Sequence, residues 1–530
     1  MRIVLRDIRL KADASESDAI GAAVRQLNTV LGAGNYRNAC VYRRSIDARH
    51  VNKLTSVWSV CAETEDNSVS DSQLKQLNAT HIDDGELDVV YGDTVANHRP
   101  LVVGFGPAGM FCALLLAENG YRPIVIERGK DIEGRAKSVA LFREKGILDT
   151  ECNVQFGAGG AGTFSDGKLV TRINDKKTGY VIKTFHKYGA PDSILTSAKP
   201  HIGTDNLGKI VTSVKNRIEE CGGNVYFNTR FDGYKKQKDG IAVSTNNGDF
   251  ICSSLVLAIG HSARDTYQIL AKSGLDMISK AFSVGVRVEQ LQEDINRSIY
   301  GKYADRLGNA EYNFSYRKGE RAVYTFCMCP GGQVVEAASE ENTVVVNGMS
   351  NYKRDGKNSN AALVVSVLPE DCGAGLFDGM NFQRHLEHKA FLMGGSNYGA
   401  PMQTVGDYLN GCKGTCFSRI KPTYMNGEKY ALCDLNELFP NYINSFLKEG
   451  LVRFENKVRG YAPADAVMSG VETRTSSPIR IVRNEMMVSM TDEDIFPCGE
   501  GAGYAGGITS AAVDGLRTAM MVMQRYKPFS

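Results

Sequence analysis

Apolar and polar residues alternate at the start of the chain in a way that predicts a small α/β unit. Residues 1–12 (MRIVLRDIRLKA) follow the two-residue period of a strand, whereas apolar positions in 15–31 recur at helical spacing behind Ser15, a residue suited to cap a helix. Two more strands are expected over 39–49 and 54–64. The sequence therefore predicts a separate N-terminal domain of helix and strands.

A second pattern begins near residue 100, after a polar segment (83–100) that contains glycine and proline and is expected to be a linker. Residues 101–106 (LVVGFG) predict a short buried strand, a helix is expected over 107–119, and 123–129 (PIVIERG) predict the next strand. This order of strand, glycine turn, helix and strand is typical of the start of a Rossmann-type sheet.

The rest of the chain changes character twice. Residues 224–260 are strand-rich, and 282–456 hold strands and loops without a βαβ rhythm, which indicates an inserted mixed α+β cap domain. An apolar strand over 494–500 and a final helix over 506–523 then return to the earlier pattern. The sequence predicts four segments: a small N-terminal α/β domain (1–90), the first part of a nucleotide-binding domain (97–281), the inserted cap (282–456) and the C-terminal part of the nucleotide-binding domain (457–530).

The first glycine turn carries the strongest chemical signal. Gly104, Gly106 and Gly109 form G-x-G-x-x-G directly after a strand, which permits a tight turn, close approach of a pyrophosphate to the helix N-terminus, and close helix–strand packing. Pro107 falls in the first helical turn, where its missing N–H is not needed. Glu127 lies 23 residues after Gly104, where a carboxylate can accept both hydroxyls of an adenosine ribose and would repel a 2′-phosphate. The ligand predicted here is therefore FAD or NAD.

A second G-x-G-x-x-G, at Gly501, Gly503 and Gly506, is followed by only 24 residues. These residues supply a helix and no further strand, so this motif cannot be a nucleotide-binding unit of its own. A helix that begins near Gly506 presents free N–H groups and a positive dipole end, which favour the negative charge of a reduced flavin. Glu500 would then bind ribityl hydroxyls. Glycine loops at both ends of one long cofactor favour FAD over NAD.

Two further segments are expected beside the cofactor. The loop FGAGGAGTFSDGKL has four glycines within six residues, which suits close passage by a phosphate or flavin ring. The strand that ends at 258–260 resembles the element by which two-domain flavoproteins pass behind the cofactor, and Arg135 is expected to reach the pyrophosphate. The residues expected to contact FAD are Gly104, Gly106, Pro107, Ala108, Gly109, Glu127, Arg128, Arg135, Gly159, Gly160, Ala161, Gly162, Thr163, Ala258, Gly260, Gly499, Glu500, Gly506, Gly507 and Ile508.

Eight segments together resemble a known group of proteins. In order they are GFGPAG…ERG, FGAGGAGTFSDGKL, PHIGTDNL, AIGHSARDTY, FCMCPGGQVV, NGMS, GVETRTSSPIRI and GEGAGYAGGITSAA. From about residue 100 the chain resembles the bacterial family of uncharacterised FAD-dependent dehydrogenases (NAD(FAD)-utilising dehydrogenase-like), in the glutathione-reductase-type flavoprotein superfamily. The resemblance implies non-covalent FAD, a Rossmann-type (three-layer ββα) FAD-binding domain split by a cap, and redox chemistry. The chain has Ala158 where the family's FGEGGAG has glutamate, which removes an acid or base from that position.

Flavin chemistry requires few protein groups, chiefly a positive potential near the flavin and a hydride path. Lys168 is the candidate cation, with a solvated loop lysine as the alternative. His261 is a candidate proton shuttle and His201 a second one, each with a structural histidine as the alternative. Arg474, with Glu472, is a candidate to bind an acidic substrate group, with an internal ion pair as the alternative.

Composition and charge limit the partners and the cellular compartment that can be expected. The net charge of +2 gives no support for nucleic-acid binding, and neither a signal peptide nor an apolar run long enough to cross a bilayer is present, so we expect a cytoplasmic protein without a membrane partner. The 13 cysteines are read as reduced thiols. No metal is expected, because neither cysteine pair has the usual C-x₂-C spacing of metal ligands. A redox or metal role stays open for Cys327, Cys329, Cys412 and Cys416.

The sequence thus predicts an FAD-dependent oxidoreductase in which a hydride passes through flavin N5. The substrate is an unknown small molecule, and NAD(P)H or another electron donor is expected to bind only transiently, because the chain has one complete dinucleotide unit. Two alternatives remain: a flavin-dependent RNA-modifying enzyme, and a non-enzymatic flavin-binding regulatory protein.

Overall fold

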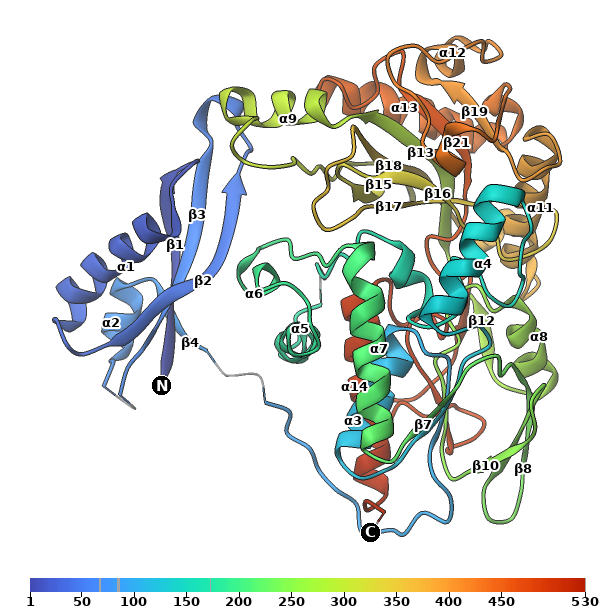
Figure 1. Ribbon diagram of the computed structural model, residues 1–530, viewed down its shortest axis with the longest axis horizontal. Coiled ribbons are helices and arrows are strands. Elements are labelled where there is room, and N and C mark those ends of the chain that lie inside the picture. The colour runs from blue at the N-terminus through green and yellow to red at the C-terminus, as the bar shows by residue number, and fades with distance from the viewer. Residues whose placement is uncertain (66–67, 83–85, 172, 530) are drawn as a thin grey trace.

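The structure is a computed structural model that describes residues 1–65, 68–82, 86–171 and 173–529. Figure 1 shows the N-terminal unit, in blue, standing to one side of a central unit that contains the long helices α3, α7 and α14. A third unit, the cap, lies above the central one in this view. The mixed α/β class predicted from the sequence is confirmed.

The N-terminal unit is a four-stranded antiparallel sheet in the order β2-β3-β1-β4. Its elements are β1 (Arg2–Lys11), α1 (Glu16–Leu31), β2 (Arg37–Asp47), β3 (Thr55–Glu63), α2 (Asp71–Gln76) and β4 (Ala79–Ile82). This βαββαβ order is the ferredoxin-like arrangement. The predicted cap is confirmed, because the Ser15 side chain accepts from the N–H of Asp18 in a capping box. The sequence pattern missed α2 and β4, which are too short to show a period.

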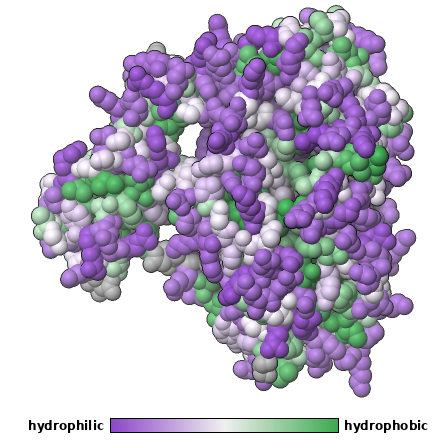
Figure 2. Space-filling model, viewed as in Figure 1, coloured by the Kyte–Doolittle hydropathy of each residue, from purple (hydrophilic) through white to green (hydrophobic). Residues whose placement is uncertain are grey.

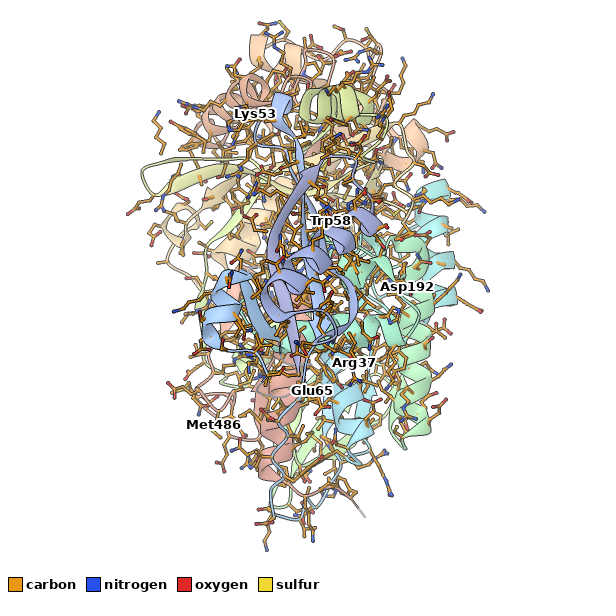
Figure 3. The ribbon with its side chains drawn as sticks, turned by 90° about the vertical axis from the view of Figure 1, so that its left-hand side faces the viewer. Arg37, Lys53, Trp58, Glu65, Asp192 and Met486 are labelled. Atoms are coloured by element: carbon orange, nitrogen blue, oxygen red, sulfur yellow. The ribbon has the colours of Figure 1, made fainter. Side chains whose placement is uncertain are left out.

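The N-terminal unit contacts the rest of the chain at its edge strand and at one hairpin end. The N–H of Ala198 donates to the carbonyl of Arg44 at 2.9 Å, and the hairpin turn η1 (Val51–Lys53) packs on α9 (Gln292–Tyr300). Figure 3, which faces this unit, shows Lys53 at its upper end and Trp58 nearer its centre. Figure 2 shows a mostly hydrophilic surface in which apolar areas are small and separated.

The central unit has three layers around a parallel sheet in the order β23-β11-β5-β6-β7. Val102 of β5 packs toward the helices, whereas Leu101 and Val103 pack toward the antiparallel sheet β10-β9-β8. These strands are β5 (Leu101–Val103), β6 (Ile124–Ile126), β7 (Asn224–Tyr226), β8 (Phe231–Lys236), β9 (Ile241–Thr245), β10 (Phe250–Cys252), β11 (Leu255–Leu257) and β23 (Ile495–Pro497). The order of sheet, sheet and helix layers is the predicted three-layer ββα arrangement.

Two helices at opposite ends of the sequence form the centre of the helical layer. A Cβ on Gly515 would lie 2.1 Å from the carbonyl oxygen of Ala108, so α3 and α14 cross in direct backbone contact. This contact places the last helix against the first glycine turn. The main helices of the unit are α3 (Pro107–Glu118), α4 (Ile132–Lys145), α5 (Lys177–Lys187), α7 (Thr204–Glu220), α8 (Arg264–Lys272) and α14 (Ile508–Arg525).

The cap is built on a seven-stranded sheet in the order β14-β15-β18-β13-β21-β19-β20. Helices α11 (Asp378–Met393) and α13 (Asn441–Lys457) pack on it. Its strands are β13 (Phe282–Leu291), β14 (Ser315–Lys318), β15 (Arg321–Cys329), β18 (Asn358–Val367), β19 (Ala400–Thr404), β20 (Tyr430–Leu432) and β21 (Val467–Glu472). The sequence pattern had placed 467–472 in the C-terminal part of the nucleotide-binding domain. In the structure this strand pairs with β13 and β19, because its apolar residues complete the cap core.

The segment before the central unit packs against the end of α14. Residues 83–85 of the expected linker lie outside the described residues, but the N–H of Gly92 donates to the carbonyl of Met523 at 2.8 Å. A Cβ at Gly92 would lie 2.5 Å from the backbone of Arg525. Among the helices of the described residues, none has both the length and the apolar character that crossing a membrane requires.

Candidate functional site

The first glycine turn is set by backbone packing at two of its three glycines. Gly104 has φ +99°, and a Cβ there would lie 2.3 Å from the carbonyl oxygen of Ala258. A Cβ on Gly109 would lie 1.9 Å from the carbonyl oxygen of Gly104. Gly106 differs, because it caps α3 with φ −82° and its nearest outside neighbour would be the Cα of Gly160, at 3.7 Å. Gly106 is therefore the glycine that leaves room for a ligand.

Glu127 is buried at the end of β6, where it binds backbone groups. Its Oε2 accepts from the N–H of Phe105 at 2.9 Å, and its Oε1 accepts from Gly129 at 3.0 Å and Gly157 at 2.9 Å. A carboxylate offers about four acceptor positions, so three are used. In this arrangement Glu127 can accept one ribose hydroxyl rather than the two expected from the sequence.

Arg135 does not reach outward to a pyrophosphate, as the sequence had suggested. Its side chain is fully buried, and its Nε and Nη2 donate to the carbonyls of Asn153 and Val154, each at 2.9 Å. Its Nη1 donates to Ala158 and Gly160 at 2.7 and 2.9 Å. Burial lowers the pKa of Arg135 to about 10, so it stays charged at neutral pH. Arg135 shapes the second glycine loop and places a positive charge behind it.

The second glycine loop lies directly on the first glycine turn. A Cβ on Gly160 would lie 3.0 Å from the Cα of Gly106, and one on Gly162 would lie 3.1 Å from Ile508 and 3.8 Å from Pro107. The structure thus brings together residues from three of the predicted cofactor segments. Ala161 lies with them in the short helix η2 (Gly160–Phe164).

Gly159 and Thr163 fix this loop from within. The N–H of Gly159 donates to Phe105 at 2.8 Å, and the hydroxyl of Thr163 donates to Ala158 at 3.2 Å. Both residues therefore position the loop with bonds inside the protein.

The terminal glycine loop joins the same site from the other end of the chain. A Cβ on Gly499 would lie 2.6 Å from the Cβ of Ala108, and the hydroxyl of Thr509 donates to the carbonyl of Leu169 at 2.8 Å. Gly506 and Gly507 are exposed, with nothing within 4 Å of an added Cβ. The N-terminus of α14 therefore faces open space beside the other two loops.

Two other residues that were expected to contact FAD, Gly260 and Arg128, take part in packing within the protein. A Cβ on Gly501 would lie 2.6 Å from the backbone of Gly260, so the terminal loop rests on the end of β11. Arg128 forms a bidentate pair with Asp265 at 2.9 and 2.7 Å and also bonds Glu151. Its guanidinium thus joins the sheet to α8.

Glu500 and His261 form the polar centre of the site. Their closest atoms, Oε1 and Nδ1, are 3.6 Å apart, and the buried Nε2 of His261 has no hydrogen-bond partner among the described residues. Burial raises the pKa of Glu500 to about 7, an effect that Lys280 opposes. Burial lowers the pKa of His261 to about 3, helped by the charges of Arg474 and Arg264. His261 is therefore neutral, and Glu500 is the group that titrates near pH 7.

Lys168 lies in a network that joins the second glycine loop to the cap. Its Nζ donates to the carbonyl of Met328 and lies 3.9 Å from Glu311 and 4.0 Å from Asp166. Asp166 is buried and accepts from Arg354, which also bonds Glu311 at 2.7 Å. Lys168 thus carries a positive charge at the boundary between the two units.

Arg474 lies in a buried ion cluster centred on Glu387, which corresponds to the internal pair considered from the sequence. Its Nε donates to Oε1 of Glu387 at 2.9 Å and its Nη2 to Oε2 at 3.1 Å. Arg264 binds the same carboxylate through two bonds of 2.8 Å. The buried Nη1 of Arg474 has no partner within the described chain. The two N–H bonds of this nitrogen are therefore not used by the described residues.

These features fit an extended dinucleotide. The open side of Gly106, the charge of Arg135 and the exposed N-terminus of α14 suit phosphate and flavin. No described residue donates a hydrogen bond to the carboxylate of Glu500, so this carboxylate can accept from a ribityl hydroxyl. The chain therefore has groups suited to the pyrophosphate, to one ribose hydroxyl and to the ribityl chain of FAD.

Comparison with known proteins agrees with this assignment. Residues 281–475 match the family model described as FAD-dependent protein, C-terminal domain-like, and residues 102–175 match that of the NAD(P)-binding Rossmann-like domain. An uncharacterized protein of Clostridium beijerinckii (strain ATCC 51743 / NCIMB 8052) is 44% identical over 494 residues, which cover 92% of each chain. Fold and family together define an FAD-dependent oxidoreductase. The chain belongs to the same family as the C. beijerinckii protein.

Two solved structures illustrate a distant likeness. CtdE in complex with FAD is 10% identical, with 81% of this chain and 86% of that chain covered and a TM-score of 0.33. The geranylgeranyl bacteriochlorophyll reductase-like protein Ta0516 of Thermoplasma acidophilum is 12% identical, with 81% and 79% covered and a TM-score of 0.34. At this level of similarity we draw no conclusion from them.

Sequence reasoning missed several buried charged residues within the cap and at its boundary with the central unit. Arg287 is fully buried in β13 and forms a bidentate pair with Glu472 at 2.8 and 3.1 Å. Glu387 and Arg264 are buried in the same way. The signal that could have found Arg287 is a charge within the apolar stretch VGVRV of this strand. Within the described ranges there is no group of three or more His, Cys, Asp or Glu arranged to hold a metal ion.

Proposed function

We propose that the protein binds FAD non-covalently, as a member of the glutathione-reductase-type superfamily, and transfers a hydride between flavin N5 and a small molecule in the cytoplasm. The observation that carries this proposal is the meeting of Gly160 and Gly162 with Gly106, Pro107 and Ile508 beside the open end of α14. When bound, FAD supplies the group that accepts and donates the hydride.

The chain's own groups bind and orient this cofactor. Backbone N–H groups at the start of α3 hold the pyrophosphate, supported by the charge of Arg135. Glu127 accepts one ribose hydroxyl and Glu500 accepts from the ribityl chain. The cap, held to the second glycine loop through Lys168, covers the flavin and excludes water.

The affinity for FAD is expected to rise between pH 6 and pH 8. The pKa of Glu500 is about 7 in the protein without ligand, and a hydroxyl that donates to this carboxylate favours its ionised form. Binding therefore releases a proton below pH 7 and becomes tighter as the pH rises through that value. Titration of the apoprotein with FAD, followed by flavin fluorescence from pH 6 to 8.5, measures this slope.

Glu500→Gln is the matched control for that slope, because it keeps the shape and removes the titration. The variant should bind FAD with an affinity that does not change around pH 7. An unchanged slope in the variant would assign the pH dependence to another group.

A nicotinamide is expected to act only as a transient donor. The chain has one complete dinucleotide turn, so NADH or NADPH should reduce the flavin slowly and without saturating at low micromolar concentration. Stopped-flow absorbance at the flavin band tests this. Fast, saturable bleaching at low micromolar NADH or NADPH would show a second nucleotide site, and a purified protein that is colourless and takes up no FAD would refute the proposed function.

A further inference from the structure

Two cysteines of the cap, Cys327 and Cys329, lie at an irregular point of strand β15. The register between β15 and β18 shifts between Phe326 and Cys329, so one extra residue bulges out of the sheet. Cys327 has φ +44°, a left-handed conformation that residues other than glycine adopt rarely. The bulge therefore removes this pair from the regular alternation of the strand.

The bulge is held in place by cations from two different units. Arg287 of β13 donates to the carbonyl of Cys327 at 3.0 Å, and its Nη1 lies 4.0 Å from Sγ of Cys329. Lys168, from the second glycine loop, donates to the carbonyl of Met328, the residue between the cysteines. A cation of the flavin-binding unit thus contacts the dithiol segment directly.

The two thiols differ in character. Cys329 Sγ donates to the carbonyl oxygen of Cys327 at 3.4 Å. Interaction with the Cys329 thiol, together with the charges of Arg287 and Lys168 and against the effect of burial, lowers the pKa of Cys327 to about 6. The same interaction raises the pKa of Cys329. At neutral pH the pair is therefore one thiolate beside one thiol, the state needed for attack and proton release.

The pair also lies at the boundary with the flavin-binding unit. Cys327 is half-buried rather than enclosed, and the carbonyl of its neighbour Met328 accepts from Lys168 of the second glycine loop. Lys168 and Glu500 belong to the loops that meet at the proposed cofactor site. The cysteine segment of the cap therefore contacts the loop that is proposed to bind the cofactor.

We infer that Cys327 and Cys329 form a redox-active dithiol that closes to a disulfide and delivers its electrons to the bound flavin. This inference rests on the proposed function. The Cys327 thiolate and the Cys329 thiol form one S–S bond while the S–H bond of Cys329 breaks. Two electrons and one proton leave the pair, and oxidised FAD accepts them. In the reverse direction the reduced cofactor returns two electrons and one proton and reopens the disulfide. The reduced pair thereby offers a route by which a thiol or disulfide substrate exchanges electrons with the flavin.

Thiol labelling of the full-length holoprotein tests this. The protein is equilibrated anaerobically in glutathione buffers of increasing oxidation, quenched in acid with N-ethylmaleimide, and digested with trypsin. The peptide 322–353 contains Cys327, Cys329 and no other cysteine. As the buffer becomes more oxidising, this peptide should change from carrying two N-ethylmaleimide labels to carrying none. Its mass should then show the loss of two hydrogens and no attached glutathione. Two labels in every buffer, or glutathione adducts in place of the disulfide, would overturn the inference.

The chain offers its own control in Cys40 and Cys61, whose sulfurs are 3.2 Å apart in the N-terminal unit. Burial, with the Cys61 hydrogen bond, raises the pKa of Cys40 to about 11. At pH 7 iodoacetamide should therefore modify half-buried Cys327 faster than exposed Cys40. The rate at Cys327 should have its midpoint near pH 6, and Lys168→Gln should move that midpoint upward. Equal rates at the two residues would contradict a thiolate at Cys327.

Two cysteine variants and the flavin absorbance distinguish failure of the dithiol inference from failure of the proposed function. Cys329→Ser should leave Cys327 to form a mixed disulfide with glutathione, whereas Cys327→Ser should leave the peptide reduced. The flavin absorbance of each sample is recorded before labelling. A coloured protein with two labels throughout refutes the dithiol alone, whereas a colourless protein refutes the proposed function and, with it, the transfer to flavin.

Discussion

Gly106→Ala is expected to weaken FAD binding roughly 10- to 100-fold while the protein stays folded. Gly106 has φ −82°, which alanine adopts readily, and the added Cβ would meet only the Cα of Gly160 at 3.7 Å. The methyl group therefore fits the protein without ligand. It stands where the pyrophosphate must approach the first N–H groups of α3, and those charge-assisted hydrogen bonds are lost.

Gly109→Ala is the matched control, because it adds the same methyl group three residues away. There the Cβ would lie 1.9 Å from the carbonyl oxygen of Gly104, so the turn itself must open. We expect this variant to lower the thermal midpoint of the apoprotein, and Gly106→Ala to leave it nearly unchanged. Circular dichroism melting and FAD titration of both variants measure the two effects. Unchanged FAD affinity in Gly106→Ala would remove the pyrophosphate from this turn.

The glycine loops could be predicted because each one has a local cause. Positive φ at Gly104 and the close contact at Gly109 are requirements of a single strand–turn–helix unit, which a short stretch of sequence contains in full. The open end of α14 follows in the same way from a strand, a glycine run and a helix. Local sequence patterns were therefore enough to predict the glycine loops that the structure brings together.

The partners of the buried charges could not be predicted, because they depend on contacts between distant segments. Arg135 has the spacing of a residue that reaches a phosphate, yet its donors all bind carbonyls 18 to 25 residues further along. Asp166 finds Arg354 across 188 residues, and Arg264 finds Glu387 across 123. Strand β21 shows the same limit, since its apolar sequence suits either sheet and only its pairing with β13 places it in the cap.

Glu387→Gln is expected to produce the largest loss of stability, about 3–5 kcal/mol in the free energy of unfolding. The carboxylate is fully buried and receives two hydrogen bonds from each of Arg264 and Arg474. An amide keeps the volume but removes the charge, so two buried guanidinium groups lose their shared counter-ion. For a unit of this size the loss corresponds to a fall of roughly 6–20 °C in the thermal midpoint.

The pH dependence of this deficit identifies its cause. Arg264 and Arg474, against the effect of burial, lower the pKa of Glu387 from 4.5 to about 2. A carboxyl with a depressed pKa stabilises the fold above the unfolded value, and that contribution is lost as the pH falls through the folded value. The deficit of Glu387→Gln relative to the native protein should therefore be full at pH 7 and shrink between pH 4.5 and pH 2. Urea unfolding at pH 7 and pH 3.5 measures both points.

Glu340→Gln is the control that separates burial from charge alone. Glu340 binds Arg264 as well as Arg384, but its side chain is 29% exposed whereas that of Glu387 is 0% exposed. Water can replace part of what Glu340 provides, so its loss should cost only about 1 kcal/mol. Equal costs for the two substitutions would mean that the buried cluster is not the structural centre of the cap. A stability of Glu387→Gln that matches the native protein at pH 7 would mean that the two arginines find other partners, which would contradict this prediction.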